Sequence, residues 1–81
     1  MSNAAAAIAT RLANRGYITK RSQAEVVGAG RSDWTRWVDG KRKPKVATVR
    51  RWLASAAERG VELWLEVRIE GVEAHVVEVE R

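Results

Sequence analysis

Apolar residues recur three and four positions apart between residues 4 and 59, which is the spacing of one face of an α-helix. The spacing predicts four helices, over residues 4–15, 20–27, 31–38 and 46–59. The side chains expected on their inner faces are Ile8, Leu12, Ala24, Val27, Trp34, Trp37, Val38, Val49, Trp52, Leu53, Ala56 and Ala57. Because the three tryptophans in this set follow the helical spacing, we expect them in the core and not as stacking platforms for single-stranded bases.

Residues that favour helix ends stand between these segments. Ser2 or Asn3 is suited to cap the first helix, and Gly16 suits the position just past its end. Thr19 is a favoured N-cap for the second helix. Residues 28–30, Gly-Ala-Gly, are too few for a flexible linker, so we expect a tight turn that leads directly into the third helix.

From residue 61 the apolar period changes to two, which is typical of a β-strand. A Glu-Gly turn signal at residues 70–71 is followed by a second run rich in β-branched residues. The sequence therefore predicts an antiparallel hairpin. A two-residue loop at residues 70–71 would place Glu66 opposite His75, a favourable cross-strand pair, and this is the simplest role for the histidine.

Composition excludes several classes of protein. The chain has 81 residues, of which 46% are hydrophobic and 31% charged, so we expect one small globular domain. It has no cysteine and one histidine, which excludes a disulfide framework, a thiolate metal site and a pair of histidine ligands. The sequence shows no Gly-rich phosphate loop, nucleophile–base pair or carboxylate pair, so we expect neither an enzyme nor a cofactor. The longest apolar run, residues 4–9, is too short for a bilayer, and no secretory leader is apparent, so we expect a cytoplasmic protein.

Positive charge is concentrated in the helical part of the chain. Residues 1–59 carry 13 Lys and Arg against 4 Asp and Glu, a formal charge of +9, whereas residues 60–81 carry 2 Arg against 6 Glu, a charge of −4. A basic body with an acidic end indicates a polyanionic partner for the body and a different role for the end. A basic surface that serves only solubility is the alternative at this point.

Residues 18–44 read ITKRSQAEVVGAGRSDWTRWVDGKRKP. This stretch resembles the Cro/cI-type (xenobiotic-response-element) helix-turn-helix family. In that family Thr begins the second helix, a glycine marks the turn, an amphipathic third helix follows, and a glycine and a proline come after it. The resemblance covers residues 4–59 and is strongest at WVDGKRKP, residues 37–44.

The sequence departs from this family pattern at four positions. Gln23 stands where an apolar residue is usual, and Trp34 stands where Ile or Val is usual. Gly30 replaces the usual Ser or Thr cap, and Val38 replaces the common Glu. We therefore expect the space between the helices to be packed differently from that of a typical member.

The resemblance implies an α+β fold that is mainly α, with a four-helix lambda-repressor-like helix-turn-helix core over residues 1–60 and an antiparallel β-hairpin over residues 61–81.

With Trp34 and Trp37 turned inward, the outer face of the third helix would enter the DNA major groove, where Arg binds guanine O6 and N7. The expected base-reading residues are Arg31, Ser32, Thr35 and Arg36. The residues expected to bind phosphates are Thr19, Lys20, Arg21, Lys41, Arg42, Lys43 and Lys45. Asp33 is suited either to accept from a cytosine amine or to complement the helix dipole, and the second role is favoured.

The hairpin is similar to the strand pair that ends the Cro repressor of lambdoid phages, where it forms the dimer. The residues expected at such an interface are Leu63, Leu65, Val67, Ile69 and Val76. Trp64 falls on the other face of the first strand. The sequence leaves open which face covers the helices and which meets a partner.

These features predict a sequence-specific transcriptional regulator, a homodimeric repressor on double-stranded DNA with no membrane association. A phage, plasmid or other mobile element would suit so small a regulator by analogy, and a second regulatory protein is a candidate partner. The alternative is an antitoxin-like protein-interaction module whose hairpin binds a partner protein. An RNA-binding adaptor would need exposed aromatic residues on a sheet, and only Trp64 qualifies.

Overall fold

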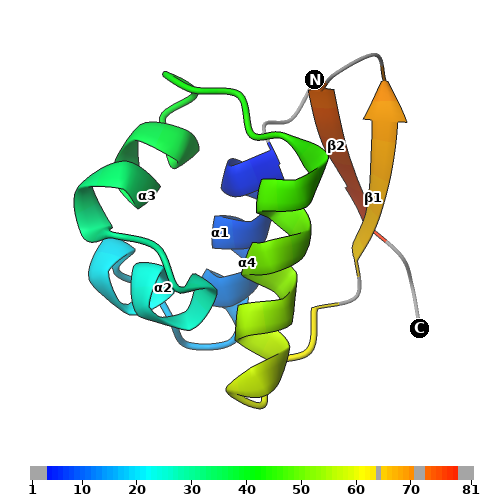
Figure 1. Cartoon of the computed structure of the whole chain (residues 1–81). Helices are drawn as coiled ribbons and strands as arrows, with labels where there is room; N and C mark the ends of the chain where they lie inside the picture. The colour runs from blue at the N-terminus through cyan, green and yellow to red at the C-terminus, as the bar shows by residue number, and fades with distance from the viewer. Residues whose placement is uncertain (1–3, 64, 71–72, 79–81) are drawn as a thin grey trace.

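Helices form the core of the molecule, and two strands follow them in the chain (Figure 1). The computed structural model describes residues 4–63, 65–70 and 73–78. Within these residues the elements are α1 (Ala4–Asn14), α2 (Lys20–Val27), α3 (Arg31–Val38), α4 (Val46–Glu58), β1 (Leu65–Glu70) and β2 (Glu73–Glu78). The prediction of four helices is confirmed. α2 and α3 have the predicted bounds, and α1 and α4 each end one residue before the predicted end.

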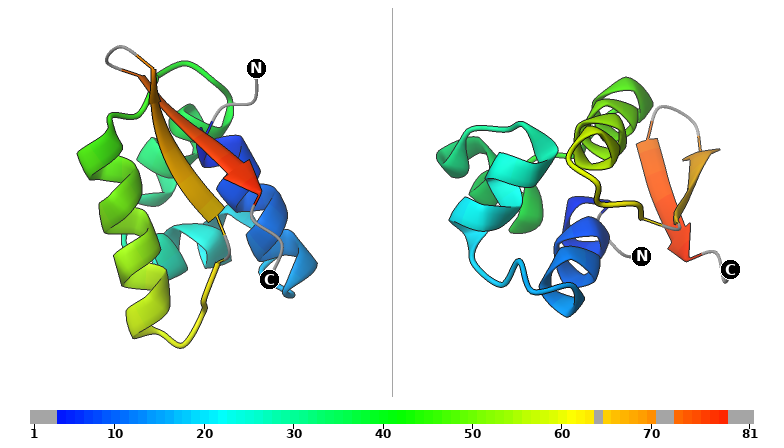
Figure 2. Two further views of the ribbon diagram at one scale, coloured as in Figure 1. Left: turned by 90° about the vertical axis from the view of Figure 1, so that its right-hand side faces the viewer. Right: turned by 90° about the horizontal axis from the view of Figure 1, so that it is seen from below.

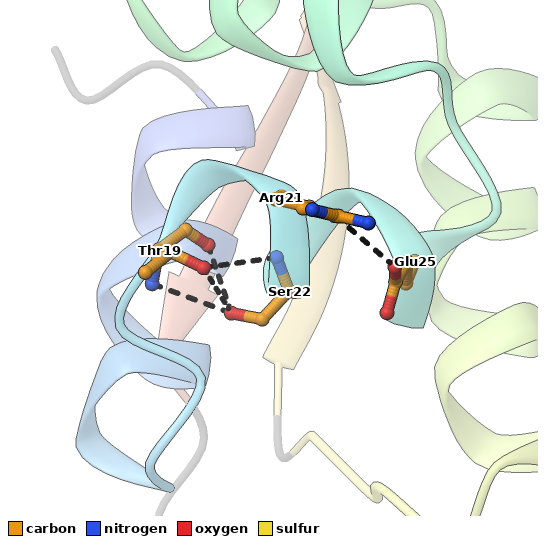
Figure 3. Close-up of polar contacts among 4 residues, drawn as sticks. All are labelled: Thr19, Arg21, Ser22 and Glu25. Carbon is orange, nitrogen blue, oxygen red and sulfur yellow. Dashed lines mark hydrogen bonds and ion pairs between the residues drawn. The ribbon is translucent and has the colours of Figure 1, made fainter.

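A capping box begins α2, in which Thr19 is the N-cap that the sequence predicts and Ser22 is its partner (Figure 3). The backbone N–H of Ser22 donates to the Thr19 hydroxyl over 3.1 Å, and the backbone N–H of Thr19 donates to the Ser22 hydroxyl over 3.3 Å. Two N–H groups that the helix leaves without an internal acceptor are thereby bonded. The predicted capping residues of α1, Ser2 and Asn3, lie outside the described residues.

A close approach between two helices fixes the turn that joins α2 to α3. Gly28 ends α2 with a φ of +73°, a left-handed conformation that favours glycine. A Cβ atom at this position would lie 2.9 Å from the Ser55 hydroxyl of α4. That hydroxyl is itself held, because it donates to the Val26 carbonyl over 3.0 Å. α4 therefore sets the direction in which the chain leaves α2 and enters α3.

The core is built around two perpendicular indoles. Trp34 is completely buried, and its ring centroid lies 5.1 Å from that of Trp52 at an interplanar angle of 89°. Ile8, Leu12 and Val49 are buried around them. The tryptophan predictions are confirmed for Trp34 and Trp52, which are core residues.

The inner face of the helices is narrower than the sequence predicts. Trp37, Val38 and Leu53 are only partly buried, although they pack against the core. Ala57 was expected on the inner face of α4, but it is exposed. Since successive residues are rotated by about 100° on a helix, Ala57 turns away from the core when its neighbour Ala56 points directly into it.

Two of the departures from the family pattern are bonded to each other. The indole N–H of Trp34 donates to the Gln23 side-chain oxygen over 3.1 Å. The Gln23 amide nitrogen donates to the Tyr17 carbonyl over 2.9 Å. A buried indole N–H needs an acceptor, and Gln23, which is 3% exposed, provides one inside the core. The polar residue in an apolar position is thus the partner that the larger aromatic residue requires.

β1 and β2 pair in antiparallel fashion beside the helices. α1 and α4 lie between this pair of strands and the α2–α3 pair (Figures 1 and 2). The register aligns Val67 with Val76 and Arg68 with His75, which differs by two residues from the register expected from a loop at residues 70–71. A shift of two leaves every residue on its original face, so the alternating pattern does not distinguish the two registers. Trp64 lies outside the described residues.

Candidate nucleic-acid interface

The beginning of α2 carries exposed cations. Thr19, Lys20 and Arg21 are all exposed, and the two cations lie in the first turn of the helix. The positive end of the helix dipole adds to their charge, which suits a phosphate. Arg21 also has an acidic neighbour, because its Nε atom lies 3.8 Å from a Glu25 carboxylate oxygen one turn further along α2 (Figure 3).

The outer face of α3 presents most of the residues expected to read bases. Arg31, Ser32 and Arg36 are exposed. Thr35 is half-buried, and its hydroxyl donates to the Arg31 carbonyl over 3.0 Å. Its hydrogen is therefore used within the helix, and its oxygen remains an acceptor. Of the four predicted base-reading side chains, three are exposed and Thr35 is half-buried.

Pro44 anchors the basic loop that follows α3. Pro44 is buried, whereas the four cations around it are exposed, namely Lys41, Arg42, Lys43 and Lys45. The backbone N–H of Lys41 donates to the Arg36 carbonyl over 3.1 Å, which ties the start of the loop to the end of α3. The loop therefore holds its charges next to the exposed face of α3.

Asp33 links α3 to this loop. Its Oδ1 atom lies 3.9 Å from Arg36 Nη1 in α3 and 3.9 Å from Arg42 Nη1 in the loop. Asp33 stands in the first turn of α3, where a carboxylate complements the helix dipole, as the sequence favours. The contact with Arg42 crosses nine residues of chain, and no local sequence signal indicates it.

A hollow of about 420 Å³ lies between the α2–α3 turn, α3 and α4. Asp33, Trp37 and Arg42 line it from one side, and Thr48 and Arg51 of α4 line it too. The Arg42 guanidinium carbon lies 5.9 Å from the Trp37 ring centroid, within the range of a cation–π contact. Arg51 is an exposed cation that the sequence alone does not connect with this surface, because most of the other residues that line the hollow lie far from it in the chain, in α3, the turn before it and the loop after it.

Hydrogen bonds and ion pairs join the separate parts of this surface. The Tyr17–Gln23–Trp34 hydrogen bonds connect the chain before α2 with α3, and Asp33 connects α3 with the loop. The predicted dimer residues lie elsewhere. Leu63 is partly buried and packs against the helical core. For the other four, the structure describes the backbone, in β1 for Leu65, Val67 and Ile69 and in β2 for Val76.

No protein-family model matches the chain, and searches of curated proteins and of solved structures found no match. Among the helices of the described residues, none is both long enough and apolar enough to cross a bilayer.

Proposed function

We propose that this protein is a sequence-specific DNA-binding transcriptional regulator of the Cro/cI helix-turn-helix type, acting as a homodimeric repressor. In this proposal α2 and α3 form a lambda-repressor-like helix-turn-helix, and α3 lies in the major groove. The observation that carries it is the exposed face of α3, where Arg31, Ser32 and Arg36 stand beside the exposed basic loop of residues 41–45. An exposed helix face with flanking cations is suited to supply both base contacts and phosphate contacts.

The distribution of charge supports the same proposal. Residues 1–59 carry a formal charge of +9, and the acidic residues 60–81 carry −4. α1 and α4 separate β1 and β2 from the α2–α3 pair (Figure 2). The glutamate-containing strands β1 and β2, on the far side of the helices, would not repel the phosphates that the basic side attracts. In this proposal the strands form a Cro-like hairpin that joins two copies of the chain.

Selection of duplexes from a random pool, with binding then measured at several salt concentrations, tests the function. We expect a two-fold symmetric site whose half-sites lie about 34 Å apart, because each copy of α3 would enter one of two successive major grooves. With roughly 6–10 phosphate contacts per dimer, affinity should fall by ~10³–10⁵ between 50 and 200 mM salt. Failure to select any sequence, or binding that does not respond to salt, would contradict the proposal. Tight binding of a partner protein without DNA binding would favour the antitoxin-like alternative.

A further inference from the structure

Acidic residues are scarce in the basic part of the chain, and two of the four lie against arginines of the proposed DNA-binding surface. Glu25 pairs with Arg21 inside a single helix. Asp33 differs because it contacts two elements, through Arg36 in α3 and Arg42 in the loop. Arg36 is a proposed base reader and Arg42 a proposed phosphate ligand. One carboxylate therefore contacts both kinds of DNA-binding residue.

We propose that Asp33 is a specificity-determining residue, whose carboxylate acts as an internal counter-ion that DNA phosphates must replace at Arg42. This inference rests on the proposed function. In the unbound protein Asp33 holds both guanidinium groups. On DNA, Arg42 turns to a phosphate, and Asp33 stays beside Arg36 and orients it toward a base.

The surroundings of Arg42 fit this exchange. Its guanidinium lies between the Asp33 carboxylate, at 3.9 Å, and the Trp37 ring, with 5.9 Å to the ring centroid. The Trp37 ring is itself fixed, because its centroid lies 5.5 Å from that of the buried Trp52. Arg42 therefore rests against a rigid aromatic surface and one acid, and a phosphate is able to replace the acid without disturbing the core.

The three side chains that take part in this exchange are exposed to solvent. The side chains of Asp33, Arg36 and Arg42 are 56%, 54% and 51% exposed. Ion pairs in such positions are screened by solvent and change an equilibrium by no more than about fivefold. The contact is therefore weak enough to be replaced by a DNA phosphate.

The consequence is a difference between correct and incorrect sites. On any duplex, Arg42 leaves Asp33 for a phosphate. On an incorrect site no guanine holds Arg36, so Arg36 also turns to a phosphate, and the carboxylate, now without either partner, faces the phosphate backbone, which disfavours binding. On the correct site, Arg36 donates two N–H groups to a guanine while its remaining donors still face Asp33, because a guanidinium has five. The carboxylate is then still paired, so its penalty applies mainly to incorrect sequences. Specificity of this kind comes from weakening the wrong complex.

Asp33→Asn tests the inference, because it removes the charge and keeps the shape. We expect affinity for a scrambled duplex to rise about two- to fivefold in 0.1 M salt, with a salt slope steeper by up to about 0.9. Affinity for the selected site should change by less than about twofold. Asp39→Asn is the matched control. Asp39 is an exposed acid at the end of the same helix, with no ion pair among the described residues. In Asp39→Asn the ratio of the affinity for the selected site to the affinity for the scrambled duplex should therefore stay at the wild-type value.

Three results would overturn the inference. If Asp33→Asn and Asp39→Asn raise both affinities equally, only net charge matters. If Asp33→Asn weakens binding to the selected site and changes the preferred base, Asp33 reads that base directly. If it leaves the affinity ratio unchanged while the wild-type protein still selects a sequence, the counter-ion role fails and the proposed function stands. A wild-type protein without sequence preference would instead remove the proposed function, and this inference with it.

A measurement without DNA checks the contact itself. The NMR signals of the Arg42 side-chain N–H and of the Trp37 indole N–H should shift in Asp33→Asn and stay unchanged in Asp39→Asn. Urea unfolding of both variants gives the fraction folded in the binding buffer, so that a loss of helix-dipole stabilisation is separated from an effect on binding. Unchanged Arg42 signals in Asp33→Asn would show that the carboxylate does not hold this arginine.

Discussion

The hydrogen bond between Gln23 and Trp34 is the clearest residue-scale feature of this core. Both side chains are buried, and they connect α2 with α3, the two helices of the proposed DNA-binding motif. A hydrogen bond between two polar groups in a core has a strict geometry, whereas apolar contacts tolerate sliding. We therefore interpret the pair as a device that fixes the angle between the two helices.

Gln23→Leu would restore an apolar residue and leave the Trp34 N–H without an acceptor. We expect it to lower the free energy of unfolding by about 1–3 kcal/mol, because a buried donor would lose its partner. In a Trp34→Phe background the same change should cost less, because no indole N–H remains to be bonded. Urea unfolding of the four proteins measures both costs. Equal costs in the two backgrounds would show that the hydrogen bond contributes nothing.

At the scale of elements, the α2–α3 turn depends on its close approach to α4. Gly28 combines a φ of +73° with a potential Cβ contact of 2.9 Å to the Ser55 hydroxyl. Gly16, which follows α1, has a φ of +99° and open space around its Cβ position. Substitutions at the two glycines therefore distinguish the cost of a left-handed backbone from the cost of crowding against α4.

Gly16→Ala should lower the free energy of unfolding by about 1–2 kcal/mol, the cost of a left-handed backbone with a side chain. Gly28→Ala should cost at least about 1 kcal/mol more, because Ser55 is held by its hydrogen bond and does not move aside freely. Chemical unfolding of both variants checks the difference. Equal losses would mean that α4 does not constrain the turn.

Sequence patterns predict the elements well where the determining signal is local. Thr19 is a favoured N-cap residue, and Ser22, three residues on, can bond with it. Gly28 directly follows the apolar residues Val26 and Val27. Both ends of α2 were therefore predictable. The strand register was not, because the alternating pattern is the same after a shift of two residues.

The candidate site could be predicted only in part for a similar reason. The exposure of the cations of α3 follows from the helical period, and the cations of the loop were expected from the basic run between two predicted helices. The contacts of Asp33 with Arg42, and of Arg51 with the hollow, depend on how a loop folds back and where α4 lies. Neither the period of a helix nor the charge of a residue contains that information.

At the scale of the whole molecule, DNA binding of the proposed kind requires two copies of the chain. One short helix in one groove gives too few contacts for tight specific binding, so a second copy must be held one helical turn of DNA away. β1 and β2 are the elements proposed to hold it. An isolated two-stranded hairpin is marginally stable, and here the strands lie beside α1 and α4.

Val67→Asp combined with Val76→Asp tests this assembly in the full-length chain. These residues are aligned across β1 and β2, so the two new carboxylates would stand opposite each other. We expect the double variant to sediment as a monomer at micromolar concentration, where the wild type is a dimer, and to lose binding to the selected site. A wild-type monomer, or a double variant that remains a dimer, would assign the dimer interface to another surface.

The central claim is that α3 reads the base sequence, and repeating the random-duplex selection with Arg36→Ala and Lys41→Ala proteins tests it most directly. Both residues are exposed cations, one on the outer face of α3 and one in the loop that follows. Arg36→Ala should lose preference at one base pair per half-site and bind the wild-type site more weakly by about 1–3 kcal/mol. Lys41→Ala should select the wild-type sequence and weaken binding to all duplexes alike, with a salt slope flatter by about 0.9. An Arg36→Ala protein that selects the wild-type sequence unchanged would contradict the account.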